Sequence, residues 1–168
     1  MNDSTSNIQI GLDYQLSPNF NIGMLVRTDH RDWMEKNKIE GMSYIENMSR
    51  ICTEILEPVN SLLGPVFVTS CFRCPGLNKA IGGASNSQHR YAEAADIVFI
   101  NRSGDDFLKA AFNAIASSQI IYSQLIYEFG WIHVGITDEK LYPGKRLQKL
   151  QAFRINGKTT YSPVIIPI

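Results

Sequence analysis

The chain has 168 residues, of which 44% are hydrophobic and 19% charged, a composition typical of a globular protein with one core. Its 16 basic and 16 acidic residues cancel without forming a basic stripe, which argues against nucleic acid as a partner. No apolar run reaches the ~20 residues of a membrane helix. Residues 1–9 lack the pattern of a secretory signal, so an extracellular role would need another route of delivery or a leader outside this chain.

No repeat or linker divides the chain, which predicts a single domain over residues 1–168 with a loosely ordered arm at 1–15. Residues 16–31 mix apolar and polar side chains and are expected to wrap the core. Over residues 43–63, apolar side chains recur every three or four positions, which predicts a helix. Pro58 predicts a kink in this helix, and Gly64-Pro65 predicts its end.

The rest of the chain alternates short strands and helices. Strands are predicted at 66–69, 94–100, 120–128 and 131–136, and helices at 75–81 and 105–116. Asn156-Gly157 lies between two β-prone segments and predicts a hairpin. This order favours an α+β domain with a mainly antiparallel central sheet and helices packed on it.

Three residues with metal-ligating side chains lie in this region. His89 ends a loop, whereas Asp96 and His133 fall on two different predicted strands. Catalytic zinc takes three protein ligands from His, Asp and Glu and keeps one position open. The spacing alone is a weak signal, and it is also compatible with a surface histidine, a strand-end carboxylate and a buried histidine that bind no metal.

Asp96 is a carboxylate within the otherwise apolar residues 94–100. A buried charge is strongly destabilising unless it is paired or ligates a metal. A metal ion would satisfy Asp96, and so would a lysine or arginine that the sequence does not identify.

These segments resemble a family of zinc peptidases. Ser87-x-His89, then Asp96, then Trp131-x-His133 look like the motifs of the zinc D-alanyl-D-alanine carboxypeptidases. That group includes D-Ala-D-Ala dipeptidases and phage endolysins that are L-alanyl-D-glutamate endopeptidases. Residues 17–20, 71–78 and 82–89 are also similar to family segments, so the resemblance covers residues 16–136.

The resemblance implies roles for individual side chains. The implied ligands of Zn²⁺ are His89, Asp96 and His133. Arg73 matches the family's arginine, which implies that it binds substrate and stabilises charge during catalysis. Ser87 would orient the first ligand or contact the substrate, and Trp131 would line the site. The other interpretations are an exposed strand-end side chain for Arg73 and a core aromatic for Trp131.

A zinc peptidase also needs a carboxylate that moves a proton from the attacking water to the leaving amine. Many family members have an acid three residues before the second histidine, where this chain has Gly130. Glu128 is the nearest acid. If Phe129-Gly130 forms a two-residue turn, Glu128 lies opposite Trp131 and shares a face with His133. Otherwise it is a solvated acid at a hairpin tip.

Other positions also depart from the family pattern. Ala92 stands where glycine is usual, and Gly135 where a serine often follows the second histidine. Cys71 and Cys74 replace glycine and serine beside Arg73. A Cys-x-x-Cys pair could bind a structural metal, cycle as a redox pair or form a local disulfide.

The resemblance therefore predicts a Zn²⁺ site at the sheet and a metallopeptidase that hydrolyses peptidoglycan stem peptides. The three activities that share these ligands are D-Ala-D-Ala carboxypeptidase, L-Ala-D-Glu endopeptidase and cross-link endopeptidase. The absent signal fits a phage endolysin, held in the host cytoplasm until lysis and then acting on the cell wall. A zinc-containing module that binds the wall without cutting it is the second hypothesis. Neither predicts an oligomeric state.

Overall fold

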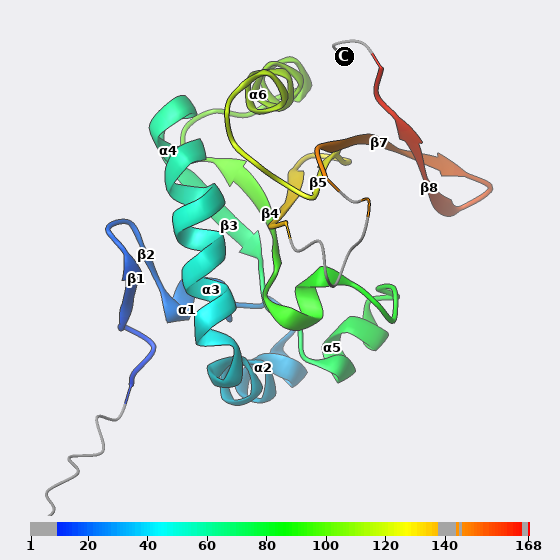
Figure 1. Ribbon diagram of the computed structural model, residues 1–168. Coiled ribbons are helices and arrows are strands. Elements are labelled where there is room, and N and C mark those ends of the chain that lie inside the picture. The colour runs from blue at the N-terminus through cyan, green and yellow to red at the C-terminus, as the bar shows by residue number, and fades with distance from the viewer. Residues whose placement is uncertain (1–9, 138–143, 145, 166–167) are drawn as a thin grey trace, which may run out of the picture.

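A computed structural model describes residues 10–137, 144, 146–165 and 168 (Figure 1). The strands are β1 (Gln15–Ser17), β2 (Phe20–Asn21), β3 (Val66–Ser70), β4 (Ala94–Phe99), β5 (Gln124–Tyr127), β6 (Ile132–Gly135), β7 (Gln148–Ile155) and β8 (Lys158–Pro163). The α-helices are α1 (Ile22–Leu25), α2 (Met34–Gly41), α3 (Ile45–Ile51), α4 (Glu57–Leu63), α5 (Pro75–Ala80) and α6 (Asp105–Ser117). Shorter helical turns are η1 (Arg31–Trp33), η2 (Met42–Tyr44), η3 (Cys52–Leu56) and η4 (Gln88–Tyr91).

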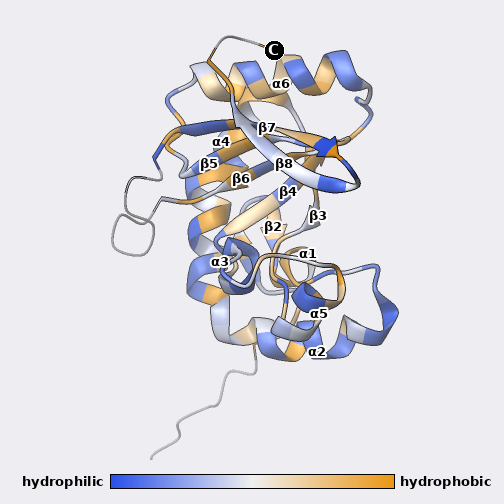
Figure 2. Cartoon of the chain, turned by 90° about the vertical axis from the view of Figure 1, so that its right-hand side faces the viewer, coloured by the Kyte–Doolittle hydropathy of each residue, from blue (hydrophilic) through white to orange (hydrophobic). Residues whose placement is uncertain are grey.

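The main sheet has the strand order β3-β4-β6-β5-β7-β8, and β1 and β2 form a separate small sheet. All neighbouring strands are antiparallel except β5 and β7, which run parallel. In both views α6 lies at one end of the molecule and α2 and α5 at the other, with the sheet between them (Figures 1 and 2). The predicted α+β domain with a mainly antiparallel sheet is confirmed.

The long helix predicted over residues 43–63 is present, with a change of pitch in its middle. α3 continues into η3, which is a π-helical segment, and then into α4. Pro58 has no N–H to donate to the preceding turn, and the Glu57 N–H bonds to the carbonyl of Cys52, five residues back. Where the sequence predicts a kink, the structure has a π segment just before Pro58, and the helix continues through the proline as α4. Gly64, with φ of +93°, ends the helix as predicted.

Most of the predicted strands and helices agree with the structure to within a residue or two. The strand predicted over 120–128 is shorter, because its ladder runs only over Gln124–Tyr127, and Ile120 and Tyr122 are buried in the core before it. The hairpin at Asn156-Gly157 is confirmed, with φ of +51° and +76° at the two turn residues. Such angles at both central positions are those of a type I′ turn.

The predicted arm at residues 1–15 falls mostly outside the described residues. Of its described part, the carbonyls of Leu12 and Tyr14 accept hydrogen bonds from the backbone of Gly23 and Ile22. Within the described part of the chain, no helix is both long and apolar enough to cross a membrane.

The two faces of the main sheet have different partners because successive side chains on a strand alternate. Ile97, Ile132 and Tyr127 are aligned across β4, β6 and β5, and the Tyr127 ring contacts Phe112 of α6. This is the face that α6 covers. Asp96, one residue before Ile97, points to the opposite face.

Candidate active site

A cleft of about 660 Å³ lies on the face of the sheet that carries Asp96. One wall is the loop over residues 81–84 and 86–89, and the other is formed by β7 and β8. The sheet supplies the floor, with Asp96, Ile126, Glu128, Trp131 and His133. All the site residues predicted from the sequence line this one cleft.

The three candidate ligands converge at the centre of this floor. Asp96 and His133 are direct partners across β4 and β6, and His133 Nδ1 lies 2.9 Å from Asp96 Oδ1. His89 comes from η4, and its Nε2 lies 3.2 Å from the same oxygen and 3.1 Å from His133 Nδ1. All three side chains are buried. Among the described residues, this is the group of His, Cys, Asp and Glu side chains that could hold a metal.

The environment of His89 fixes its tautomer. Its Nδ1 lies 2.8 Å from the backbone carbonyl of Cys71, and a carbonyl only accepts hydrogen bonds. Nδ1 therefore carries the proton, and Nε2 presents a lone pair to Asp96 and His133. A hydrogen bond on the far nitrogen is the usual way in which a protein orients a metal-binding histidine.

The charge states also suit a cation. Although burial alone would raise the pKa of Asp96, the charges and hydrogen bonds of His89 and His133 hold it well below its usual range. Burial lowers the pKa of His89, which outweighs the opposing effect of Asp96. An ionised carboxylate beside a neutral imidazole is the protonation state that binds a metal.

The spacing of the donor atoms fits a small divalent metal. Two ligands at about 2.0–2.1 Å from a tetrahedral zinc lie about 3.3 Å apart. The observed separations of 2.9–3.2 Å are close to this value, so a metal requires only a small outward movement of the three side chains. Their donor set, two imidazoles and one carboxylate, is also that of catalytic zinc sites.

Arg73 is the positively charged partner of Asp96 that the sequence did not identify. Its guanidinium pairs with Asp96 Oδ2, while its Nε donates to Ser70 Oγ at 2.7 Å. Asp96 therefore has Oδ1 directed at the two histidines and Oδ2 held by Arg73. The arginine is 16% exposed and lines the cleft, which differs from the exposed strand-end interpretation.

The turn on which the position of Glu128 depends is present. The Glu128 N–H bonds to the carbonyl of Trp131 at 3.0 Å, and Gly130 has φ of +127°. Ile126 pairs with His133, so Glu128, two residues further along, lies on the same face as that histidine. Phe129-Gly130 is thus the two-residue connection, and Glu128 lines the cleft rather than extending into solvent.

Glu128 is half-buried, and burial raises its pKa while the nearby His133 opposes the rise. A half-buried carboxyl in a cleft, with its pKa raised, is a candidate for accepting and returning protons. The structure thus brings one such acid to the edge of the three-ligand cluster.

A comparison with known families gives this geometry a context. The peptidase M15 family matches residues 26–135, which is well over half of the chain and includes the three candidate ligands. The chain belongs to the peptidase M15 family. No curated protein sequence matches it. M15 peptidases are metal-dependent, which agrees with the cluster of His89, Asp96 and His133.

Two further predicted site residues of this M15 peptidase line the same cleft as the three candidate ligands. Ser87 is half-buried, lines the cleft and directly precedes η4, but its side chain makes no capping hydrogen bond. Trp131 is also half-buried, and its indole N–H is shielded from solvent without a partner among the described residues. Buried donors without a partner are uncommon in folded proteins.

The cysteines form no disulfide, since Cys52, Cys71 and Cys74 are all free and buried. Burial raises the pKa of the Cys71 thiol well above its usual range, so it is a poor nucleophile and a poor redox group. The local disulfide and the redox pair considered for Cys71 and Cys74 are therefore not supported. The Cys71 contribution to the site is its backbone carbonyl, which orients His89.

Gln88, the first residue of η4, and Ser123 were not predicted as residues of the site. Their side chains hydrogen-bond to each other in a buried position beside η4. A Cβ atom built on Gly135 would lie 2.5 Å from Gln88 Oε1 and 2.8 Å from Ser123 Oγ. The glycine that replaces the family's serine therefore leaves room for this pair. The glycine at position 135 was the one sequence feature that pointed to this pair, because a missing side chain implies that other groups fill the space.

Gly135→Ser is expected to destabilise the protein by about 1–3 kcal/mol, because the new side chain overpacks the site of Gln88 and Ser123. Urea unfolding measures the change. Combining it with Ser123→Gly should recover part of the loss, since this removes one of the two clashing atoms. A single variant as stable as the wild type would contradict the account of Gly135.

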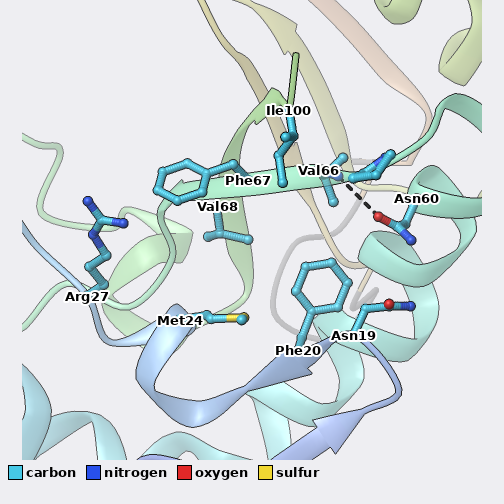
Figure 3. Close-up of a pocket in the computed structure, with 10 residues that line it drawn as sticks. Asn19, Phe20, Met24, Arg27, Asn60, Val66, Phe67, Val68 and Ile100 are labelled. Carbon is cyan, nitrogen blue, oxygen red and sulfur yellow. Dashed lines mark hydrogen bonds between the residues drawn. The ribbon is translucent and has the colours of Figure 1, made fainter. Parts of the chain in front are cut away.

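A second cavity, of about 230 Å³, lies at the outer edge of β3 and is lined mostly by apolar side chains (Figure 3). Phe20, Met24 and Val68 face it, and Arg27 stands at its rim (Figure 3). The Arg27 guanidinium stacks on Phe67 and pairs with Asp29. Because its described lining residues include no acid, histidine or cysteine, this cavity lacks the groups that hydrolysis requires.

Proposed function

We propose that this M15 metallopeptidase is a zinc enzyme that hydrolyses peptide bonds in peptidoglycan stem peptides. The observation that carries the proposal is the convergence of His89, Asp96 and His133 on one cleft floor, with Glu128 on the same face. The bond cut is D-Ala-D-Ala, L-Ala-D-Glu or a cross-link, and the protein acts on the cell wall. A phage endolysin is the proposed setting.

In this proposal each side chain has a defined task. A zinc ion held by His89, Asp96 and His133 would polarise the scissile carbonyl and acidify a water molecule. Glu128 accepts the proton of the attacking water and delivers it to the leaving amine, for which its raised pKa is suited.

Arg73 has two tasks in the proposal. It positions the carboxylate of Asp96 through their ion pair, and it presents its remaining N–H donors to a substrate carboxylate. Ser87 and Trp131, which line the same cleft, would contact the peptide. Polar and apolar side chains both line the cleft, which suits a peptide better than a small apolar ligand.

The proposal is tested on purified peptidoglycan by measuring new amino and carboxyl termini and by mass spectrometry of the released muropeptides. We expect termini to appear with the zinc-loaded protein, to stop after chelation and to return when zinc is added. Release of no termini from several wall types, despite bound zinc, would instead favour a module that binds the wall without cutting it.

A further inference from the structure

The C-terminal hairpin forms one wall of the cleft although it lies outside the residues that match the family. β7 and β8 follow residue 135, where the match ends, and contribute Leu150, Lys158, Thr159 and Tyr161 to the cleft lining. β8 is exposed along its whole length and crosses in front of the sheet as a mainly polar strand (Figure 2). The hairpin therefore adds side chains to the site that the family match does not cover.

The strand register places Tyr161 in one row with Glu128. Tyr127 pairs with Gln151 across β5 and β7, so Glu128 comes level with Ala152, and Ala152 pairs with Tyr161 across β7 and β8. Ala152 has the smallest side chain in this row, so it leaves room for the side chain of Tyr161 to extend over β7 toward Glu128.

The phenol of Tyr161 is available as a hydrogen-bond donor. The side chain is 47% exposed, lines the cleft and has no hydrogen-bond partner among the described residues. Burial and the negative charges of Glu128 and Asp96 raise its pKa, so the hydroxyl keeps its proton at neutral pH. Tyr161, Glu128 and Asp96 all line the same cleft.

The need for such a donor follows from the contacts of Arg73. Its guanidinium is engaged with Ser70 and Asp96, so the arginine is partly committed to holding a candidate ligand. Hydrolysis of a peptide bond builds negative charge on the carbonyl oxygen, and donors aimed at that oxygen give a large part of the rate enhancement. A neutral phenol on the opposite wall can supply such a donor while Arg73 keeps its contacts with Ser70 and Asp96.

We propose that Tyr161 is a catalytic residue of the peptidase, whose hydroxyl donates a hydrogen bond to the carbonyl oxygen of the scissile bond as negative charge develops there. The inference rests on the proposed function, because it assigns Tyr161 a role in the same hydrolysis. It adds the C-terminal hairpin to the catalytic machinery.

The test compares Tyr161→Phe, which removes only the hydroxyl, with Tyr14→Phe as a matched control. Tyr14 is 48% exposed, close to the 47% of Tyr161, and does not line the cleft. We expect kcat of Tyr161→Phe on a stem peptide to fall by about 10- to 100-fold, with KM changed less than about twofold and zinc content unchanged. A non-hydrolysable phosphinate analogue of the peptide should bind more weakly by a similar factor.

Unchanged kcat and unchanged phosphinate affinity in Tyr161→Phe would overturn the inference while leaving the proposed function intact. A raised KM with wild-type kcat would also overturn it, since the hydroxyl would then bind the substrate away from the reacting carbonyl. A zinc-loaded wild-type protein that hydrolyses no stem peptide would overturn the proposed function, and the role of Tyr161 with it.

Discussion

Glu128→Gln is expected to abolish hydrolysis of stem peptides while the protein keeps close to one zinc per chain. The amide has nearly the same shape but accepts no proton, so the step from attacking water to leaving amine loses its carrier. General acid–base catalysis contributes about 10²–10⁴-fold, and kcat should fall by that order. Zinc content is expected to persist because Glu128 lies beside the cluster of His89, Asp96 and His133 and is not part of it.

Glu46→Gln on α3 is the matched control, because Glu46 is an exposed acid away from the cleft. It should retain wild-type kcat and zinc content. Full activity in Glu128→Gln would remove this residue from the mechanism. Simultaneous loss of zinc and activity would instead assign it to the metal site.

The pKa of Glu128 gives a related prediction for the metal-free protein. Burial favours the neutral carboxyl, so its midpoint is expected above the ordinary value of 4.5. As the pH falls through this raised pKa, the carboxylate is lost and with it the base. A bound dication favours the charged form, so zinc should move the midpoint down. Carbon-detected NMR titration of the side chain measures both, and a midpoint at or below 4.5 without zinc would contradict the burial of Glu128.

The second large effect is expected for Asp96→Asn, which should lose the metal. The change removes the charged ligand oxygen between the two histidines and also the partner of the Arg73 guanidinium. Changes to residues behind the ligands cost about 10- to 100-fold in metal affinity, and loss of a ligand should exceed this range. Zinc competition with a chromophoric chelator measures the affinity.

Asp96→Asn should also destabilise the metal-free protein by about 3 kcal/mol, because it leaves a largely buried arginine without its counter-charge. Asp13→Asn, at an exposed position outside the cleft, is the control for both measurements. Wild-type zinc affinity in Asp96→Asn would show that the carboxylate serves only as the partner of Arg73.

The sequence allowed Asp96 and Glu128 to be placed because strand periodicity is a local property, whereas the two histidines were predicted mainly from the family resemblance. Asp96 was identified by its charge within an apolar strand. Its direct pairing with His133 follows from the antiparallel pairing of β4 with β6. The position of Glu128 depended on a turn that a glycine at positive φ makes possible, and that turn is present. The functional roles of these residues remain predictions.

The surroundings of the floor depend on contacts between distant segments, which periodicity does not encode. No pattern in the chain pairs Arg73 with Asp96, or directs His89 at the backbone carbonyl of Cys71. The hairpin was predicted from Asn156-Gly157, but its place as a wall of the cleft follows from the parallel pairing of β5 and β7. A strand order of this kind is a property of the assembled sheet.

The most direct test of the zinc-peptidase assignment is a titration of the metal-free protein with zinc while hydrolysis of a defined stem peptide is recorded. Activity should rise in proportion to added zinc and stop rising at one zinc per chain, because one cluster of three ligands binds one ion. Saturation of the site with no hydrolysis of any stem peptide, or hydrolysis that is unaffected by removing the metal, would contradict the assignment.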